Sequence, residues 1–89
     1  MTDNQIYTMA IRVYGEYHQE CLAIEECAEL IQAINHKHRG RDNNIAEEIA
    51  DVEIMLEQLK IINDCQKEVE KIHKQKIERL YQKVYDECL

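Results

Sequence analysis

The sequence predicts an all-α protein, an antiparallel bundle of about four helices in one domain spanning residues 1–89. The chain has no proline and only two glycines, and its abundance of Glu, Ala, Ile, Leu, Lys and Gln is a helix-forming composition. Apolar residues also recur at spacings of three and four, as on one face of an α-helix. A chain of 89 residues suffices for one small domain.

Caps and glycines place the first two helices. Thr2 and Asp3 are suited to cap a first helix that ends near Gly15. A long second helix is expected over residues 16–37, ending at His36 or Lys37. The apolar stripe that we expect this helix to turn toward the core consists of Ile24, Cys27, Ala28, Ile31 and Ile34.

A basic turn separates the second helix from the third. Gly40 is suited to the left-handed conformation that ends a helix. Asn44 has the character of an N-cap, and Glu47 three residues later completes a capping-box pattern. The third helix is therefore expected over 45–62 and, after a break in the pattern, the fourth over about 65–86.

Two pairs of acids lie three residues apart on the second and third helices: Glu26 with Glu29, and Glu48 with Asp51. On an α-helix this spacing brings both carboxylates of a pair to one face. Each pair is also flanked on that face by apolar residues. Antiparallel helices joined by a short loop allow the two pairs to face each other.

Carboxylates in an apolar stripe destabilise a fold by several kcal/mol unless they are compensated, and four of them facing one another would repel. A divalent cation removes this conflict, and Mg²⁺ prefers carboxylate oxygens. The spacing thus predicts a metal site, with Mn²⁺ as an alternative ion. Its predicted ligands are Glu26, Glu29, Glu48 and Asp51.

The motifs E-E-x-x-E-L at residues 25–30 and E-E-I-A-D at residues 47–51, with the gap between them, resemble the MazG-like nucleoside triphosphate pyrophosphohydrolases. These belong to an all-α superfamily that includes dimeric dUTPases and phosphoribosyl-ATP pyrophosphatase. The resemblance runs from about Gly15 to Arg79. It implies that the four acids bind Mg²⁺ and that a (d)NTP is cleaved to a (d)NMP and pyrophosphate.

The resemblance also suggests roles for further residues. A carboxylate that is not fully committed to the metal accepts a proton from the attacking water, and Glu29 and Glu48 are the candidates. Gln19 is implied as a contact to the base. Cationic side chains suited to hold the phosphates are Lys76 and Arg79 on the basic last helix, with Lys60 as a further candidate.

Each of these interpretations has a simpler alternative. The chain contains 18 acids, so an E-x-x-E pair alone is commonly a solvated helix face. Lys76 and Arg79 are equally typical of an exposed, salt-bridged face. The competing functional classes are a non-catalytic helical-bundle interaction or regulatory protein, and a nucleotide binder that does not hydrolyse its ligand.

Composition bounds the partners. The net charge of −7 argues against nucleic acid and anionic membranes as partners. No apolar run approaches the roughly 20 residues that span a bilayer, and no signal peptide is evident, so a cytoplasmic protein is expected.

Since several helices are apolar on more than one side, we expect a homodimer or homotetramer. Buried free thiols are expected at Cys21, Cys27, Cys65 and Cys88.

Overall fold

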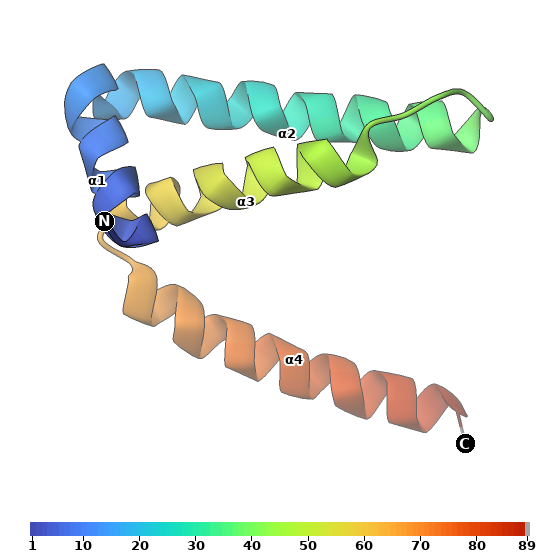
Figure 1. Cartoon of the computed structure of the whole chain (residues 1–89). Coiled ribbons are helices and arrows are strands. Elements are labelled where there is room, and N and C mark those ends of the chain that lie inside the picture. The colour runs from blue at the N-terminus through green and yellow to red at the C-terminus, as the bar shows by residue number, and fades with distance from the viewer. Residues whose placement is uncertain (89) are drawn as a thin grey trace.

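The structure is a computed structural model that describes residues 1–88. The predicted all-α class is confirmed, with no β-strand in these residues. The four helices are α1 (Asp3–Tyr14), α2 (Glu16–His38), α3 (Ile45–Ile62) and α4 (Gln66–Cys88). α2 and α3 run antiparallel side by side, α1 crosses one end of this pair, and α4 diverges from it (Figure 1). Within the described chain, no helix combines the length and apolar character that crossing a membrane requires.

Local sequence signals fix both ends of α1. The backbone N–H of Gln5 donates to the Thr2 hydroxyl over 3.1 Å, and Gln5 Oε1 accepts from the Thr2 N–H over 2.9 Å. This reciprocal pair is a capping box and confirms Thr2 as the N-cap. Gly15 follows the helix at a φ of 93°, a conformation that residues with a Cβ rarely adopt. The break predicted at Gly15 is therefore confirmed.

The turn between α2 and α3 confirms one prediction and corrects another. Gly40 has a φ of 68°, in the left-handed region as expected, although α2 runs on to His38. The predicted capping box of Asn44 with Glu47 is wrong, because the Asn44 side chain makes no capping hydrogen bond. Its Nδ2 instead donates to Glu48 Oε1 over 2.7 Å. A carboxylate one turn along the helix is a charged acceptor and forms the stronger bond.

The core lies between α2 and α3, on the side of α2 that carries the acidic pair. The predicted core stripe on the opposite side of α2 is wrong: Ile24 is 70% exposed and Ile31 is 62% exposed. α3 packs on the acidic side, where the small side chains of α2 allow the two helices to approach closely. The buried residues of the described chain are Ala23, Ala33, Val52 and Met55, with the polar Gln19, Glu48 and Gln58.

The predicted burial of the cysteines is also partly wrong. All four thiols are free, but Cys27 and Cys88 are exposed and only Cys21 and Cys65 are half-buried. The expectation of buried thiols is therefore wrong for Cys27 and Cys88. Cys27 belongs to the uncovered face of α2, and Cys88 ends α4, which no other helix of the described chain covers.

α4 stands apart from the rest of the molecule. It leaves α3 through a short link in which Asp64 has a φ of 49°, and it contacts α3 alone. None of its residues is buried. The radius of gyration is 16.3 Å, against about 12 Å for a compact domain of this length. The four helices are thus a three-helix unit with a projecting fourth helix.

Candidate metal centre

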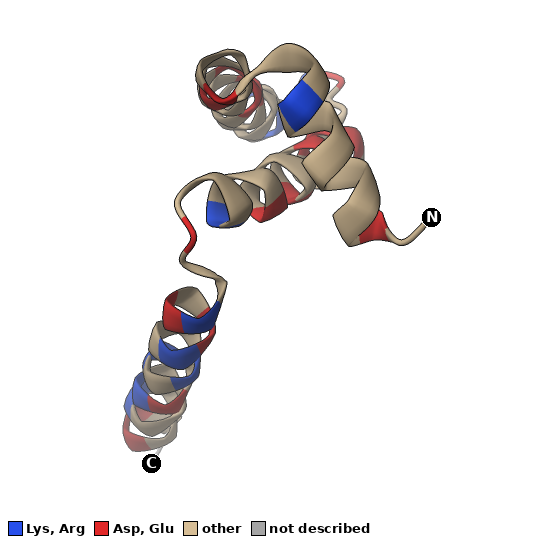
Figure 2. Cartoon of the chain, turned by 90° about the vertical axis from the view of Figure 1, so that its left-hand side faces the viewer, with Lys and Arg blue, Asp and Glu red and all other residues tan. Residues whose placement is uncertain are grey.

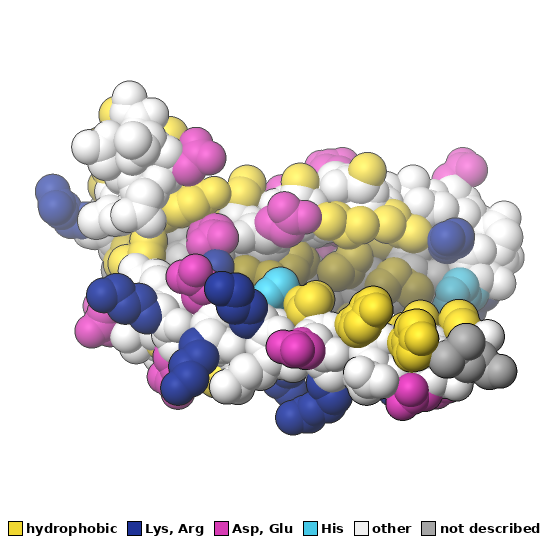
Figure 3. All heavy atoms as spheres, turned by 90° about the horizontal axis from the view of Figure 1, so that it is seen from below, with side chains coloured by type: hydrophobic (Ala, Val, Ile, Leu, Met, Phe, Trp, Pro, Cys, Tyr) yellow, Lys and Arg dark blue, Asp and Glu magenta, His cyan; other side chains and the backbone are white. Residues whose placement is uncertain are grey.

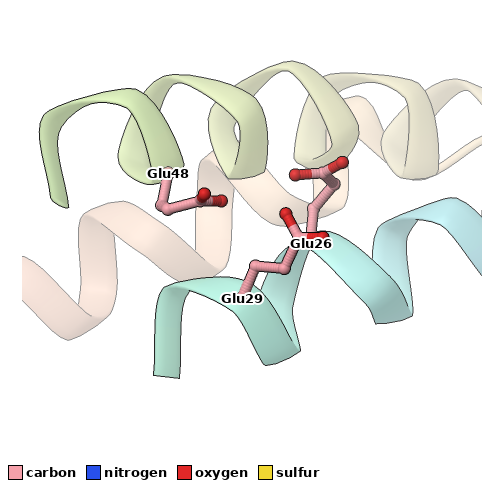
Figure 4. A group of neighbouring side chains, drawn as sticks. All are labelled: Glu26, Glu29 and Glu48. Carbon is pink, nitrogen blue, oxygen red and sulfur yellow. The ribbon is translucent and has the colours of Figure 1, made fainter. Parts of the chain in front are cut away.

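Three of the four predicted acidic ligands come together between α2 and α3. Glu26 and Glu29 extend from one side and Glu48 from the other, and their side chains converge (Figure 4). One ligand oxygen from each residue lies within 4.8 Å of the other two. The spacing of three residues places the pair on one face of α2, and the antiparallel packing brings α3 opposite to it.

Asp51, the fourth predicted ligand, lies one turn along α3 from Glu48. It does not belong to the group of oxygens within 4.8 Å. It is half-buried and lines the same hollow as Glu26, a space of about 210 Å³ between the two helices. Its charge acts on Glu26, because it contributes to raising the pKa of that carboxyl group. Direct ligation by Asp51 stays a prediction.

The electrostatic environment of the cluster opposes ionisation of Glu26. Loss of water contacts raises the pKa of the Glu26 carboxyl group above its ordinary value, and the neighbouring charges of Glu29, Asp51 and Glu48 raise it further. Oε2 of Glu26 and Oε2 of Glu48 are both buried and have no hydrogen-bond partner among residues 1–88. A buried acceptor without a partner is uncommon in a native fold and calls for a specific explanation.

Glu48 is held more firmly than the other two acids. Its side chain is only 6% exposed, and the amide of Asn44 donates to its Oε1. One oxygen is therefore fixed by the protein, while the other points into the cluster without a partner. Asn44 was not identified as a site residue from the sequence. Its spacing of four residues from Glu48, on the same helical face, is the signal that would have identified it.

The geometry suits a hard cation. Octahedral Mg²⁺ holds its oxygen ligands at about 2.0–2.1 Å, which separates them by about 3–4 Å. Oxygens that lie within 4.8 Å of one another therefore need only a small rotation to reach a shared ion. Glu29 is exposed, so its side chain is free to make this rotation. Because Glu29 is exposed, water or a ligand oxygen can reach this side of the cluster.

Gln19 lies beside the acids in a buried amide pair. Its Nε2 donates to Gln58 Oε1 over 2.8 Å, and His18 Nδ1 donates to Gln19 Oε1, also over 2.8 Å. Both glutamines line the hollow that Glu26 and Asp51 also line. Gln58 was not identified from the sequence. It follows Asp51 by seven residues, which is two turns along the same face of α3.

The predicted cationic contacts lie outside the cluster. Lys60 forms an ion pair with Glu57, at 2.9 Å between Nζ and Oε2. Lys76 and Arg79 are exposed on α4, which makes no contact with α2 among the described residues. Figure 2 shows Lys and Arg along this projecting helix. One chain therefore does not bring these side chains to the carboxylates, and their roles stay predictions.

Comparisons with known proteins returned no match: no family model fits the sequence, and no curated protein and no solved structure is similar to it.

Proposed function

We propose that this protein is a Mg²⁺-dependent nucleoside triphosphate pyrophosphohydrolase, which cleaves a (d)NTP to a (d)NMP and pyrophosphate. The observation that supports this most is the convergence of Glu26, Glu29 and Glu48 with two buried, unpartnered oxygens among them. The resemblance of the acidic motifs to the MazG-like enzymes points to the same chemistry. Mg²⁺, with Mn²⁺ as a substitute, is the proposed cofactor because three carboxylates form the donor set.

In the proposed reaction, Glu26, Glu29, Glu48 and Asp51 would hold the metal. The ion would supply neutralisation of the triphosphate charge and orientation of the attacking water. The water oxygen bonds to the phosphorus atom on one side of the α–β bridge and the P–O bond from that phosphorus to the bridging oxygen breaks, which separates the monophosphate from pyrophosphate. Glu29 or Glu48 accepts the proton of the water. Glu29 is exposed and has the freer approach to that water.

The remaining contacts concern the substrate. Gln19 is the proposed contact to the base, and its position in the hollow next to Glu26 supports this role. Lys76, Arg79 and Lys60 are the proposed partners of the phosphates, for which cationic donors are suited. In this proposal Lys76 and Arg79 act when α4 is brought close to an acidic cluster.

The test is a product assay with matched variants. The purified protein is incubated with Mg²⁺ or Mn²⁺ and a panel of ribo- and deoxynucleoside triphosphates, and monophosphate and pyrophosphate are separated and quantified. Glu48→Gln is expected to lower the rate by at least about a hundredfold, because it removes a ligand or base. The control is Glu53→Gln, which changes an exposed acid on the same helix and is expected to retain activity.

Two results would contradict the proposal. Binding of a triphosphate with Mg²⁺ but no formation of products would make the protein a nucleotide binder. Absence of both products and stabilisation by Mg²⁺ would favour a non-catalytic helical-bundle interaction protein. The exposed apolar faces of α2 and α4 fit this second class.

A further inference from the structure

The described chain leaves much more surface uncovered than a folded monomer of its size. Its accessible surface is 7392 Å², whereas a folded monomer of 10.6 kDa exposes about 5,500 Å². The excess is about 1,900 Å² for each chain. This excess indicates that the single chain is not the complete folded unit.

Part of the uncovered surface belongs to α4. Five apolar side chains form a stripe along this helix and are 37–54% exposed: Val69, Ile72, Ile77, Leu80 and Val84. A helix in water gains little stability from its backbone alone and depends on packing of its apolar face. α4 contacts only α3, and none of its residues is buried. Its 23 residues therefore need a surface to pack against.

The second uncovered surface is the side of α2 that carries Ile24 and Ile31, which lies away from the acidic cluster and along the edge of the contact with α3. It forms an apolar groove of about 500 Å³. The groove is lined by Leu59 of α3 and, on α2, by Glu20, Ala23, Ile24, Cys27, Ala28 and Ile31. Leu59 also lines a second hollow, of about 390 Å³, that reaches Val69 at the start of α4. Figure 3, seen from below, shows apolar side chains along α4 in front and on the helices behind it, with a hollow between them.

Charge distinguishes the two helices. α4 carries six Lys or Arg and five Asp or Glu, a net charge of +1, whereas α2 carries five Glu and one Lys, a net charge of −4. Lys76, Arg79 and Lys83 form a row along one edge of the α4 stripe, at spacings of three and four. Glu16 and Glu20 continue the α2 stripe toward the start of the helix, and Glu20 lines the groove. Packing α4 against α2 therefore pairs opposite charges, and packing α2 against a second α2 would not.

We propose that a second copy of this chain covers both surfaces, with α4 of each protomer lying on the Ile24 and Ile31 side of α2 of the other. Such an exchange is isologous, so one kind of contact is made twice around a two-fold axis. The excess surface of two chains is about 3,800 Å², which lies in the range of obligate homodimer interfaces. The metal centre lies on the other side of α2, so this interface requires neither the metal nor hydrolysis. It occupies Lys76 and Arg79, so it is an alternative to their proposed contacts with the phosphates, and cross-links to Glu16 or Glu20 would distinguish the two placements of α4.

The first measurement is the mass in solution, by sedimentation and light scattering at micromolar concentrations of the full chain. The expected mass is twice 10.6 kDa, or a higher even multiple. Ile31→Glu and Leu80→Glu place a charge in the proposed α2 and α4 surfaces, and each should raise the dissociation constant at least about tenfold. Val13→Glu, at an exposed apolar position on α1, is the control and should leave the assembly intact.

The second measurement identifies the contact. Protein labelled with ¹⁴N and ¹⁵N is mixed, treated with a carbodiimide that joins amines directly to carboxylates, and digested for mass spectrometry. Mixed-isotope peptides that join Lys76 or Lys83 to Glu16 or Glu20 are expected. A monomeric mass would overturn the proposal, as would an assembly whose mixed-isotope links join α4 only to α4 or never include α2. Neither measurement uses Mg²⁺ or nucleotide, so the outcome is independent of the hydrolysis assay.

Discussion

Replacing Glu26 by glutamine is expected to change stability in opposite directions without and with Mg²⁺. Without metal, Glu26 is a carboxylate with a buried, unpartnered Oε2 among other acids. Glutamine has nearly the same shape but no charge, so Glu26→Gln removes the repulsion and raises the free energy of unfolding. With metal, the same change removes a proposed ligand, so the variant is expected to gain less stability from Mg²⁺ than the wild type does.

The distances set the size of the first effect. Two unit charges at the cluster's limit of 4.8 Å repel by about 1 kcal/mol in water and by about 3.5 kcal/mol at an effective dielectric constant of 20. Because Glu29 is exposed, its contribution lies near the lower value. A gain of about 1–2 kcal/mol in the unfolding free energy is therefore expected, which is roughly 5–15 °C in melting temperature for a domain this small.

The size of the second effect follows from binding to the folded state alone. Free Mg²⁺ at a hundred times its dissociation constant stabilises a protein by about 2.7 kcal/mol. The stabilisation of the wild type is expected to approach this value as the Mg²⁺ concentration is raised. The variant should fall well short of it.

The assay is thermal unfolding followed by circular dichroism at pH 8 and fixed protein concentration, after EDTA treatment and then with added Mg²⁺. Glu53→Gln is the matched control, since it removes an exposed acid from α3 and should shift neither melting temperature much. A lower melting temperature for metal-free Glu26→Gln than for the metal-free wild type would contradict the predicted repulsion. Equal stabilisation of the variant and the wild type by Mg²⁺ would contradict Glu26 as a ligand.

Two further predictions concern the same helix pair. The pKa of Glu26 is raised above its ordinary value of 4.5, so the folded state binds a proton at this carboxyl group more tightly than the unfolded state does. The free energy of unfolding of the metal-free protein should therefore rise as the pH falls through the raised pKa toward 4.5. Urea unfolding between pH 8 and 5 should show a smaller rise in the unfolding free energy for Glu26→Gln than for the wild type. Identical pH profiles for the two proteins would mean that Glu26 is not the cause. Gln19→Leu and Gln58→Leu should each lower the free energy of unfolding by about 1–3 kcal/mol, because each leaves the other buried amide without its partner. The double variant should lose less unfolding free energy than the two single variants lose together. Strict additivity of the two losses would mean that the amides are not coupled.

The helix boundaries were predictable because local interactions decide them. The capping box of Thr2 and the positive φ angles of Gly15 and Gly40 use residues within a few positions of each boundary. The convergence of the acids was predictable for a related reason. Spacing places each pair on one face, and a short connection between α2 and α3 allows only antiparallel neighbours.

The buried face of α2 was not predictable, because both faces carry apolar residues. The choice depends on where α3 packs, and α3 packs over Ala23 and Ala33 rather than over Ile24 and Ile31. A stripe of large apolar residues predicts that a face is covered, but it does not say whether the covering helix comes from the same chain. The direction of α4 likewise depends on the short link at Asp64, and no neighbouring sequence motif predicts the conformation of that link.

The placement of the polar residues in the α2–α3 contact is unfavourable for helix packing alone and supports the proposed metal site. Three of the seven buried residues in the described chain are polar, and Glu48 is one of them. A leucine at this position would add apolar burial to a small core, whereas the carboxylate adds desolvation and repulsion. Helix packing alone gives no reason to keep charge there. A cation bound between the helices would turn this repulsion into attraction, so the acids that weaken the metal-free fold are the groups that would hold the ion.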